Sequence, residues 1–217
     1  LVGMVVGARG RRRRAPDVLL SSRRRDRVGS DRAHPARVAV SRSRGKSLGT
    51  SELVSNDSMM RLRETFTLDD VDWITEACQD AEIQRWTLVP RPYGAADARY
   101  FIEHPELELR RWVIEHDERA VGVIGVHGVN DDGDAEVGYW IAPWGRGARY
   151  ASGALDLVAV AVADDASIRA LTARIAVGNV ASRRTAERAG FAEATRIVDG
   201  CHDGDDKADA ILYRRSL

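Results

Sequence analysis

The stretch EVGYWIAPWGRGARYASGAL, at residues 136–155, predicts most about the fold of this chain. It begins with residues typical of a strand and breaks at Pro143. It then passes through a turn with glycines at 145 and 147, and it continues as a helix. A strand that leads through such a turn into a helix exposes backbone N–H groups at the positive end of the helix dipole. Because this arrangement binds anions, the stretch predicts a phosphate site.

Charge is distributed unevenly along the 217 residues, although the formal net charge is zero. Residues 1–58 contain 14 basic and 5 acidic residues, which leaves 19 basic and 28 acidic residues for the rest. We expect residues 1–58 to be a disordered basic extension, because they show no sustained apolar period. One interpretation is that this extension is an arm that contacts nucleic acid, such as ribosomal RNA, or a membrane surface. The alternative is that it results from a misassigned start ahead of Met59 and Met60. One folded domain is expected over residues 59–217.

Cysteine and histidine usage indicates neither a disulfide framework nor a metal site. Cys78 and Cys201 form no CxxC pair, so a reducing cytoplasm is the expected location. The acidic segment around His202 is more typical of a solvated loop than of a metal site, and no metal is expected. No apolar run approaches the ~18 residues of a membrane span, and we expect no membrane contact by such a segment.

Strand and helix patterns surround the opening stretch. Alternation and turn residues predict strands at 62–66, 110–116, 120–129, 136–142 and 171–177, and a last hairpin with strands at 196–198 and 210–213 around a polar loop at 199–209. Capping residues and apolar periods predict helices at 67–78, 95–103, 151–162 and 179–190, the last beginning with Asn179 as cap and ending at Gly190.

Two motifs in this order resemble the GNAT superfamily of acyl-CoA-dependent N-acyltransferases. They are EVGYWIAP…RGxxYAxxAL at residues 136–155 and NxxSRRTAERAGF at residues 179–191. The resemblance covers residues 60–217 and is strongest to the RimJ/RimL-type ribosomal-protein N-terminal acetyltransferases. It implies an α+β fold, in which a mixed, mainly antiparallel sheet has flanking helices and a splay between two central parallel strands.

The same resemblance implies acetyl-CoA as co-substrate, with its pyrophosphate on the turn at 146–151 and its thioester beside the strand at 136–142. The residues that it assigns to binding are Tyr139, Trp140, Ile141, Arg146, Gly147, Ala148, Arg149, Tyr150, Ala151 and Asn179. The family pattern at the turn, Q/R-x-x-G-x-G/A, has a glycine where this chain has Arg149. Arg149 either obstructs the approach of phosphate to the backbone or binds the pyrophosphate through its guanidinium group.

Each candidate for chemistry has an alternative structural interpretation. Glu136 is either the general base for the acceptor amine or a solvated carboxylate at a strand end. Ser182 either protonates the departing CoA thiolate or caps the helix start. Asn179 caps that helix and, by the resemblance, also contacts the pantetheine arm. A backbone N–H freed by the splay, at residue 139, 140 or 141, is expected to stabilise the oxyanion.

The sequence therefore predicts an enzyme, a monomer or homodimer, that transfers acetyl from acetyl-CoA to a primary amine such as a protein N-terminus. The alternative is a degenerate GNAT-like domain that binds acyl-CoA weakly or not at all and acts as an interaction module, and Arg149 is the residue that supports it. Residues 80–104 and 199–209 are expected to form the acceptor site, and they carry no motif that identifies the acceptor.

Overall fold

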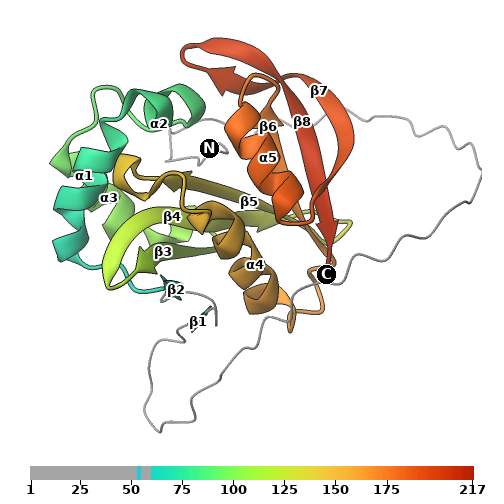
Figure 1. Cartoon of the computed structure of the whole chain (residues 1–217), viewed down its shortest axis with the longest axis horizontal. Helices are drawn as coiled ribbons and strands as arrows, with labels where there is room; N and C mark the ends of the chain where they lie inside the picture. Colours follow the sequence, from blue (N-terminus) through green and yellow to red (C-terminus); the bar gives the residue numbers. More distant parts are fainter. Residues whose placement is uncertain (1–52, 55–59) are drawn as a thin grey trace, which may run out of the picture.

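One mixed sheet forms the centre of the computed structural model, which describes residues 53–54 and 60–217 (Figure 1). Its strands lie in the order β1-β2-β3-β4-β5-β6-β8-β7. They are β1 (Leu53–Val54), β2 (Met60–Arg63), β3 (Arg110–His116), β4 (Arg119–Val129), β5 (Asp134–Ile141), β6 (Ala170–Ala176), β7 (Ala192–Asp203) and β8 (Asp206–Ser216). Every neighbouring pair is antiparallel except β5 and β6. The predicted mixed, mainly antiparallel sheet is confirmed.

Helices cover both faces of this sheet. They are α1 (Val71–Cys78), α2 (Ala81–Trp86), α3 (Ala95–Glu103), α4 (Tyr150–Val162) and α5 (Val180–Arg188), with 3-10 turns η1 (Leu68–Asp70), η2 (Pro105–Leu107) and η3 (Pro143–Gly145). One buried cluster joins α4 and α5 to the sheet, and a second joins α1, α2 and α3 to its other face. Alternate residues of β5 serve the two clusters, since Val137 and Tyr139 pack with α4 and α5, whereas Trp140 packs with α1 and α3.

The predicted helices after the opening stretch are confirmed. The residues expected to form the apolar stripe of α4 include Leu155, Val158 and Val162, and all three are buried. The side chain of Asn179 accepts a hydrogen bond from the N–H of Ser182 at 3.1 Å, as a helix cap should.

The strand expected at residues 62–66 differs from β2, which begins at Met60 and ends at Arg63. Beyond it, the guanidinium of Arg63 binds the carboxylate of Asp70 at 2.7 Å, and the ring of Phe66 packs edge-on against Phe101. The chain therefore leaves the sheet after Arg63. The apolar character of Phe66 reflects its packing against α3 and not a continuing strand.

Two segments were predicted wrongly. One is the expected loop at 199–209, and the other is helix α2, which lies before β3. The expected loop at 199–209 is mostly strand, because β7 and β8 continue to a tight turn at Gly204, where φ is +66°. Edge strand β7 is largely exposed on both faces, so it shows no apolar alternation. Helix α2 was missed because six residues are too few to show a helical period, although Asp80 caps it by accepting from the N–H groups of Glu82 and Ile83.

Residues 53–54 lie within the segment expected to be disordered, and they pair with β2 as the edge strand β1. The other residues of the predicted basic extension fall outside the described part of the chain. Within residues 60–217 the helices are all too short or too polar to cross a lipid bilayer.

Candidate active site

A splay between β5 and β6 opens the sheet at its centre. These parallel strands are paired only from Asp134 with Ala170 to Glu136 with Thr172. Beyond Glu136, β5 stays paired with β4 as far as Ile141, while β6 diverges from it. The splay implied by the sequence is therefore present, and it begins immediately after Glu136.

The backbone of β5 beyond the splay presents N–H groups to the gap. In a strand, successive residues direct their N–H and C=O groups to opposite neighbours. The N–H of Ala142 donates to the carbonyl of Val121 in β4, so the N–H of Trp140 is also directed toward β4. The N–H groups of Tyr139 and Ile141 consequently face the gap. These two, and not Trp140, are positioned to donate to a ligand between the strands.

The turn between β5 and α4 has the backbone conformation that a phosphate-binding turn requires. Gly147 has φ +82°, and Arg149, directly before the helix, has φ 62° and ψ 14°. The position that holds glycine in the family pattern is therefore left-handed here too, and Arg149 adopts this conformation despite its side chain. Among the described residues, the N–H groups of Tyr150, Ala151 and Ser152 donate no hydrogen bond. They stand at the positive end of the α4 dipole.

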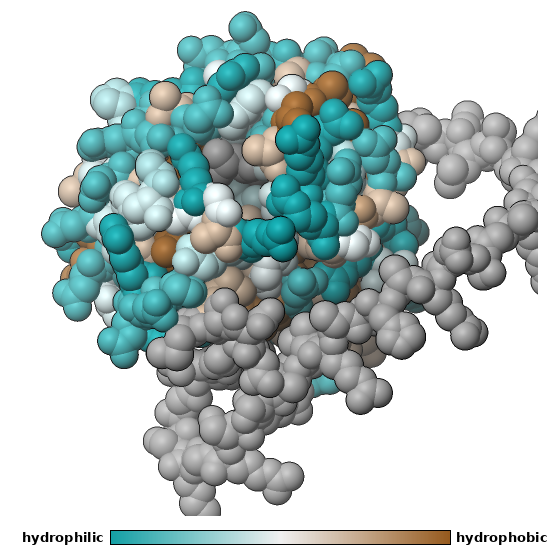
Figure 2. Space-filling model, in the orientation of Figure 1, coloured by the Kyte–Doolittle hydropathy of each residue, from teal (hydrophilic) through white to brown (hydrophobic). Residues whose placement is uncertain are grey.

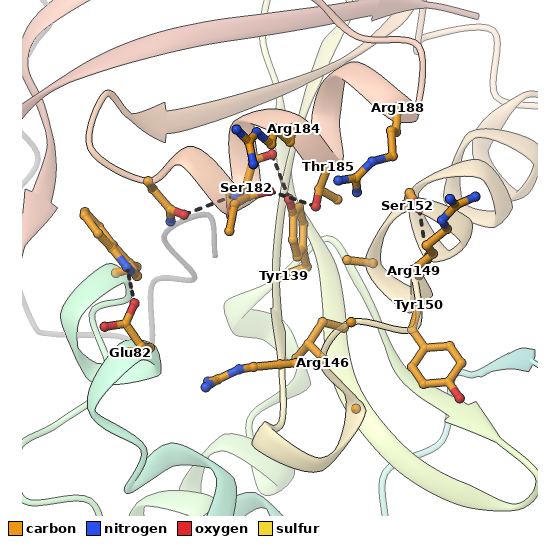
Figure 3. Close-up of a pocket in the computed structure, with 17 residues that line it drawn as sticks. Glu82, Tyr139, Arg146, Arg149, Tyr150, Ser152, Ser182, Arg184, Thr185 and Arg188 are labelled. Atoms are coloured by element: carbon orange, nitrogen blue, oxygen red, sulfur yellow. Dashed lines mark hydrogen bonds between the residues drawn. The ribbon is translucent and has the colours of Figure 1, made fainter.

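A cavity of about 490 Å³ lies in front of this helix start, between α2, the turn and α5 (Figure 3). Four arginines line it, namely Arg146 from the turn, Arg149 at the start of α4, and Arg184 and Arg188 from α5. Arg146 is bound to Asp80 at 2.5 Å. Within residues 60–217 the other three have no carboxylate partner. Figure 2 shows that strongly hydrophilic residues gather over α5 beside the hollow.

Polar groups at the inner end of this cavity are buried. The hydroxyl of Ser182 is buried and has no hydrogen-bond partner among the described residues. Because the side chain of Asn179 caps the helix, the hydroxyl of Ser182 is not used for capping. The phenol of Tyr139 lies beside it and donates to the carbonyl of Ser182 at 3.4 Å (Figure 3). Burial raises the pKa of Tyr139 to about 12, so it stays protonated at neutral pH.

A second, smaller cavity of about 180 Å³ contains Glu136. Its other polar lining residues are Thr87 after α2, His127 from β4, Arg174 from β6, and Cys201 and His202 from β7. The carboxylate of Glu136 accepts a hydrogen bond from Arg174 at 2.8 Å. Trp86 of α2 lines both cavities, so the two adjoin at this residue.

Most of the binding residues expected from the sequence come together at the larger cavity. It is lined by Tyr139, Ile141, Arg146, Gly147, Arg149, Tyr150, Ala151, Asn179 and Ser182. Three expected residues do not line it. Trp140 packs into the cluster formed with α1 and α3, Ala148 is exposed in the turn, and Glu136 faces the smaller cavity.

Arg184 and Arg188 were missed by sequence reasoning. Both lie inside the motif NxxSRRTAERAGF, four residues apart on α5. Their spacing puts them on one face of a helix, which was the available signal. Nothing in the sequence placed that face toward the turn before α4. The structure also brings no cluster of three or more metal-ligating side chains together within residues 60–217.

The Acetyltransferase (GNAT) domain family model matches residues 60–192, more than half of the chain. The chain is a GNAT acetyltransferase. No curated protein matches it significantly by sequence. The expected acetyl-CoA-dependent acetyltransferase activity is confirmed at the level of this family.

Solved structures with the same fold include several acetyltransferases. This GNAT chain is 18% identical to RimL, the ribosomal L7/L12 alpha-N-protein acetyltransferase in complex with CoA, with a TM-score of 0.68 over 77% of this chain and 98% of RimL. It is 17% identical to Mycobacterium smegmatis RimJ in complex with CoA-disulfide, with a TM-score of 0.66 over 77% of this chain and 87% of RimJ. It is 19% identical to Vibrio cholerae spermidine N-acetyltransferase in complex with CoA and spermine, with a TM-score of 0.62 over 73% of this chain and 95% of that enzyme.

The larger cavity of this GNAT acetyltransferase fits the chemistry of acetyl-CoA. The helix start and three arginines that have no acidic partner within residues 60–217 complement phosphate groups. The buried hydroxyl of Ser182, which has no partner in the part of the chain that the structure describes, is a polar group that a bound ligand can satisfy. Backbone N–H groups of β5 face the gap between β5 and β6. Acetyl-CoA is therefore the co-substrate that the family implies and that the residues present can hold.

Proposed function

We propose that this protein acetylates a primary amine, with acetyl-CoA in the larger cavity and the amine in the smaller one. The observation that carries the proposal is the cationic cavity at the start of α4, where Arg149, Arg184 and Arg188 have no acidic partner among the described residues. Like charges that converge on one cavity repel one another, and the carboxylate in its lining, Glu82, is engaged by Trp86 and Arg85 of its own helix and not by these arginines. Such a cluster is explained best by an anionic ligand.

The three arginines and the first turn of α4 bind the phosphate groups in this proposal. Backbone N–H groups bind a phosphate at the helix start, while guanidinium groups bind phosphate oxygens in pairs. Arg146 contributes less, because Asp80 already engages it. The affinity for acetyl-CoA should therefore fall as the salt concentration rises.

Acetyl-CoA supplies an activated acetyl thioester, and three groups of this chain are positioned to act on the transfer. The N–H groups of Tyr139 and Ile141 donate to negative charge that develops on the acetyl oxygen. The hydroxyl of Ser182 donates a proton to the sulfur that leaves. Its burial without a protein partner, with Asn179 as the cap, supports this role over capping.

The acceptor amine occupies the smaller cavity beside Glu136. The carboxylate there attracts an ammonium group, and Trp86 lines both this cavity and the larger one. A cavity of about 180 Å³ suits the end of an extended substrate, such as a protein N-terminus or a polyamine. RimL is named for α-N-protein acetylation, and the Vibrio cholerae enzyme for spermidine acetylation, which supports both classes.

The experiment has two stages. Calorimetric titration of the full chain with acetyl-CoA should show one binding site whose affinity weakens with added salt, and Arg184→Ala combined with Arg188→Ala should weaken it further. Mass spectrometry should then detect a gain of one acetyl group on spermine or on a short peptide with a free N-terminus. Absence of binding at millimolar acetyl-CoA would refute the proposal and favour the interaction module.

A further inference from the structure

The smaller cavity contains a histidine and glutamate pair with no role in the activity described so far. The ring Nδ1 of His127 lies 2.5 Å from a carboxylate oxygen of Glu108, the residue that follows η2. The side chain of Glu108 is 1% exposed and that of His127 is 16% exposed. The other ring nitrogen, Nε2, is buried and has no hydrogen-bond partner among the described residues.

The sequence around the pair is arranged to hold it. Between Val126 and Gly128 the pairing of β4 with β5 contains a β-bulge, so that His127 and Gly128 together lie opposite Glu136. Bulges next to active sites direct a side chain that regular pairing would place differently. A Cβ added at Gly128 would meet no atom within 4 Å, so this residue leaves space beside Glu136.

Gly125 makes room for the carboxylate behind the imidazole. A Cβ at Gly125 would lie 3.1 Å from Oε2 of Glu108, the same oxygen that binds His127. This is closer than ordinary van der Waals contact, so the carboxylate would have to move by a few tenths of an ångström to admit a side chain there. The pair thus depends on the small residue Gly125, two positions before His127 on the same strand.

The protonation of the imidazole follows from its partner. An ionised carboxylate only accepts hydrogen bonds, so the proton of the neutral ring resides on Nδ1. Nε2 then carries a lone pair and is a proton acceptor. A histidine whose far nitrogen is held by a buried carboxylate is the arrangement that orients a general base.

Glu136 is less suited to receive the proton. Its carboxylate already accepts a hydrogen bond from Arg174 at 2.8 Å, and taking up a proton would weaken that ion pair. The groups around His127 are Glu108 behind it, Glu136 on β5, Arg174 on β6, and Cys201 and His202 on β7. Of the two candidates, His127 is the one with an unsatisfied acceptor atom.

We propose that His127 is the general base for the acceptor amine, oriented by Glu108 as a positioning residue. The inference rests on the proposed function of the two cavities. The ammonium group of the acceptor gives one proton to Nε2 of His127, directly or through one water molecule. The free amine nitrogen then bonds to the acetyl carbon as the carbon–sulfur bond breaks. The second proton leaves the nitrogen and, by way of Ser182, neutralises the thiolate, so the products are the amide, the CoA thiol and imidazolium.

The first test measures transfer to spermine and to a short peptide with a free N-terminus. His127→Gln should lower kcat/KM by about 100-fold or more, the range for loss of a general base, while calorimetry shows unchanged acetyl-CoA affinity. In wild type the rate should fall as the imidazole becomes protonated at low pH. This acid limb of the pH–rate profile should be absent in His127→Gln. Glu108→Gln should change the pH at which the rate falls. Glu118→Gln, in the exposed turn between β3 and β4, is the matched control for Glu108→Gln and should behave as wild type.

Chemical rescue separates chemistry from packing. His127→Ala should regain part of its rate when imidazole is added, which a purely structural role does not permit. An unchanged rate in His127→Gln, or loss in Glu136→Gln alone, would overturn the assignment while leaving the proposed function intact. Absence of acetyl-CoA binding by wild type would instead sink the proposed function.

A second measurement needs no acceptor. In protein with ¹⁵N-labelled histidine, long-range ¹H–¹⁵N spectra of the full chain at mildly alkaline pH should show His127 as the neutral tautomer protonated on Nδ1. The Nε2-protonated tautomer would leave no lone pair on Nε2 and would overturn the inference, whichever amines the enzyme accepts.

Discussion

Replacing Arg149 by glycine should make the protein slightly more stable and should weaken its binding of acetyl-CoA. Arg149 has φ 62°, which costs a residue with a side chain about 1–2 kcal/mol. Glycine removes this strain, but it also gains about 0.4–1 kcal/mol of freedom in the unfolded chain. The net gain in unfolding free energy is about 0.5–1 kcal/mol, or about 1–4 °C in Tm for a domain of this size.

The same substitution removes a guanidinium group from the cavity that is proposed to bind phosphate. A charge-assisted hydrogen bond contributes about 1.5–3 kcal/mol, and because Arg149 is exposed we take the lower end, which is about tenfold in Kd. Stability and affinity should therefore change in opposite directions.

Two control variants separate the backbone from the cation. Arg149→Ala removes the guanidinium but keeps the strain, so it should match Arg149→Gly in affinity and fall below it in Tm. Arg149→Lys keeps the charge without the fork and should lose less affinity than either. Thermal unfolding and calorimetric titration with acetyl-CoA at two salt concentrations give both quantities. Tighter binding by Arg149→Gly would refute the reasoning and show that the side chain obstructs the turn.

Three further predictions concern Ser182, Gly125 and Asp70. Ser182→Ala should reduce kcat for acetyl transfer while the free energy of unfolding stays within about 1 kcal/mol of wild type, because its buried hydroxyl has no partner to lose among the described residues; an unchanged kcat would indicate a packing role only. Gly125→Ala should displace Glu108 and lower transfer in steady-state assays more than it lowers acetyl-CoA affinity; equal losses would point to general damage. Burial raises the pKa of Asp70, but hydrogen bonds, chiefly from Arg63, bring it below its usual value. Its stabilising contribution is present above about pH 4 and is lost as pH falls through the depressed pKa, so denaturant titrations should show a shallower acid loss in Asp70→Asn than in wild type.

Local signals were sufficient for much of the fold. The capping residue Asn179, the apolar stripe of α4 and the turn residues of the meander each act over a few positions, and their elements were predicted close to their observed bounds. Elements without such signals were missed or misplaced. Helix α2 is too short for a period, and the hairpin of β7 and β8 is held by backbone pairing at an exposed edge.

The candidate site divides in the same way. The turn at 146–151 and the residues Asn179 and Ser182 were found because a phosphate-binding helix start and a helix cap have sequence signatures. Glu136 was found as well, yet the sequence could not show that Arg174 binds it, since the two residues are 38 positions apart. Trp140 was assigned to the cofactor, but strand alternation directs it to the opposite face.

The sequence by itself determined the family, the turn that is proposed to bind phosphate and the unusual Arg149, because these depend on neighbouring residues and their backbone preferences. Only the tertiary structure decided that Arg149 adopts a left-handed backbone conformation and meets Arg184 and Arg188 in one cavity. It also decided that Glu108 lies behind His127, since sheet register and a bulge bring them together. Such contacts arise from how separate elements pack, which no local pattern encodes.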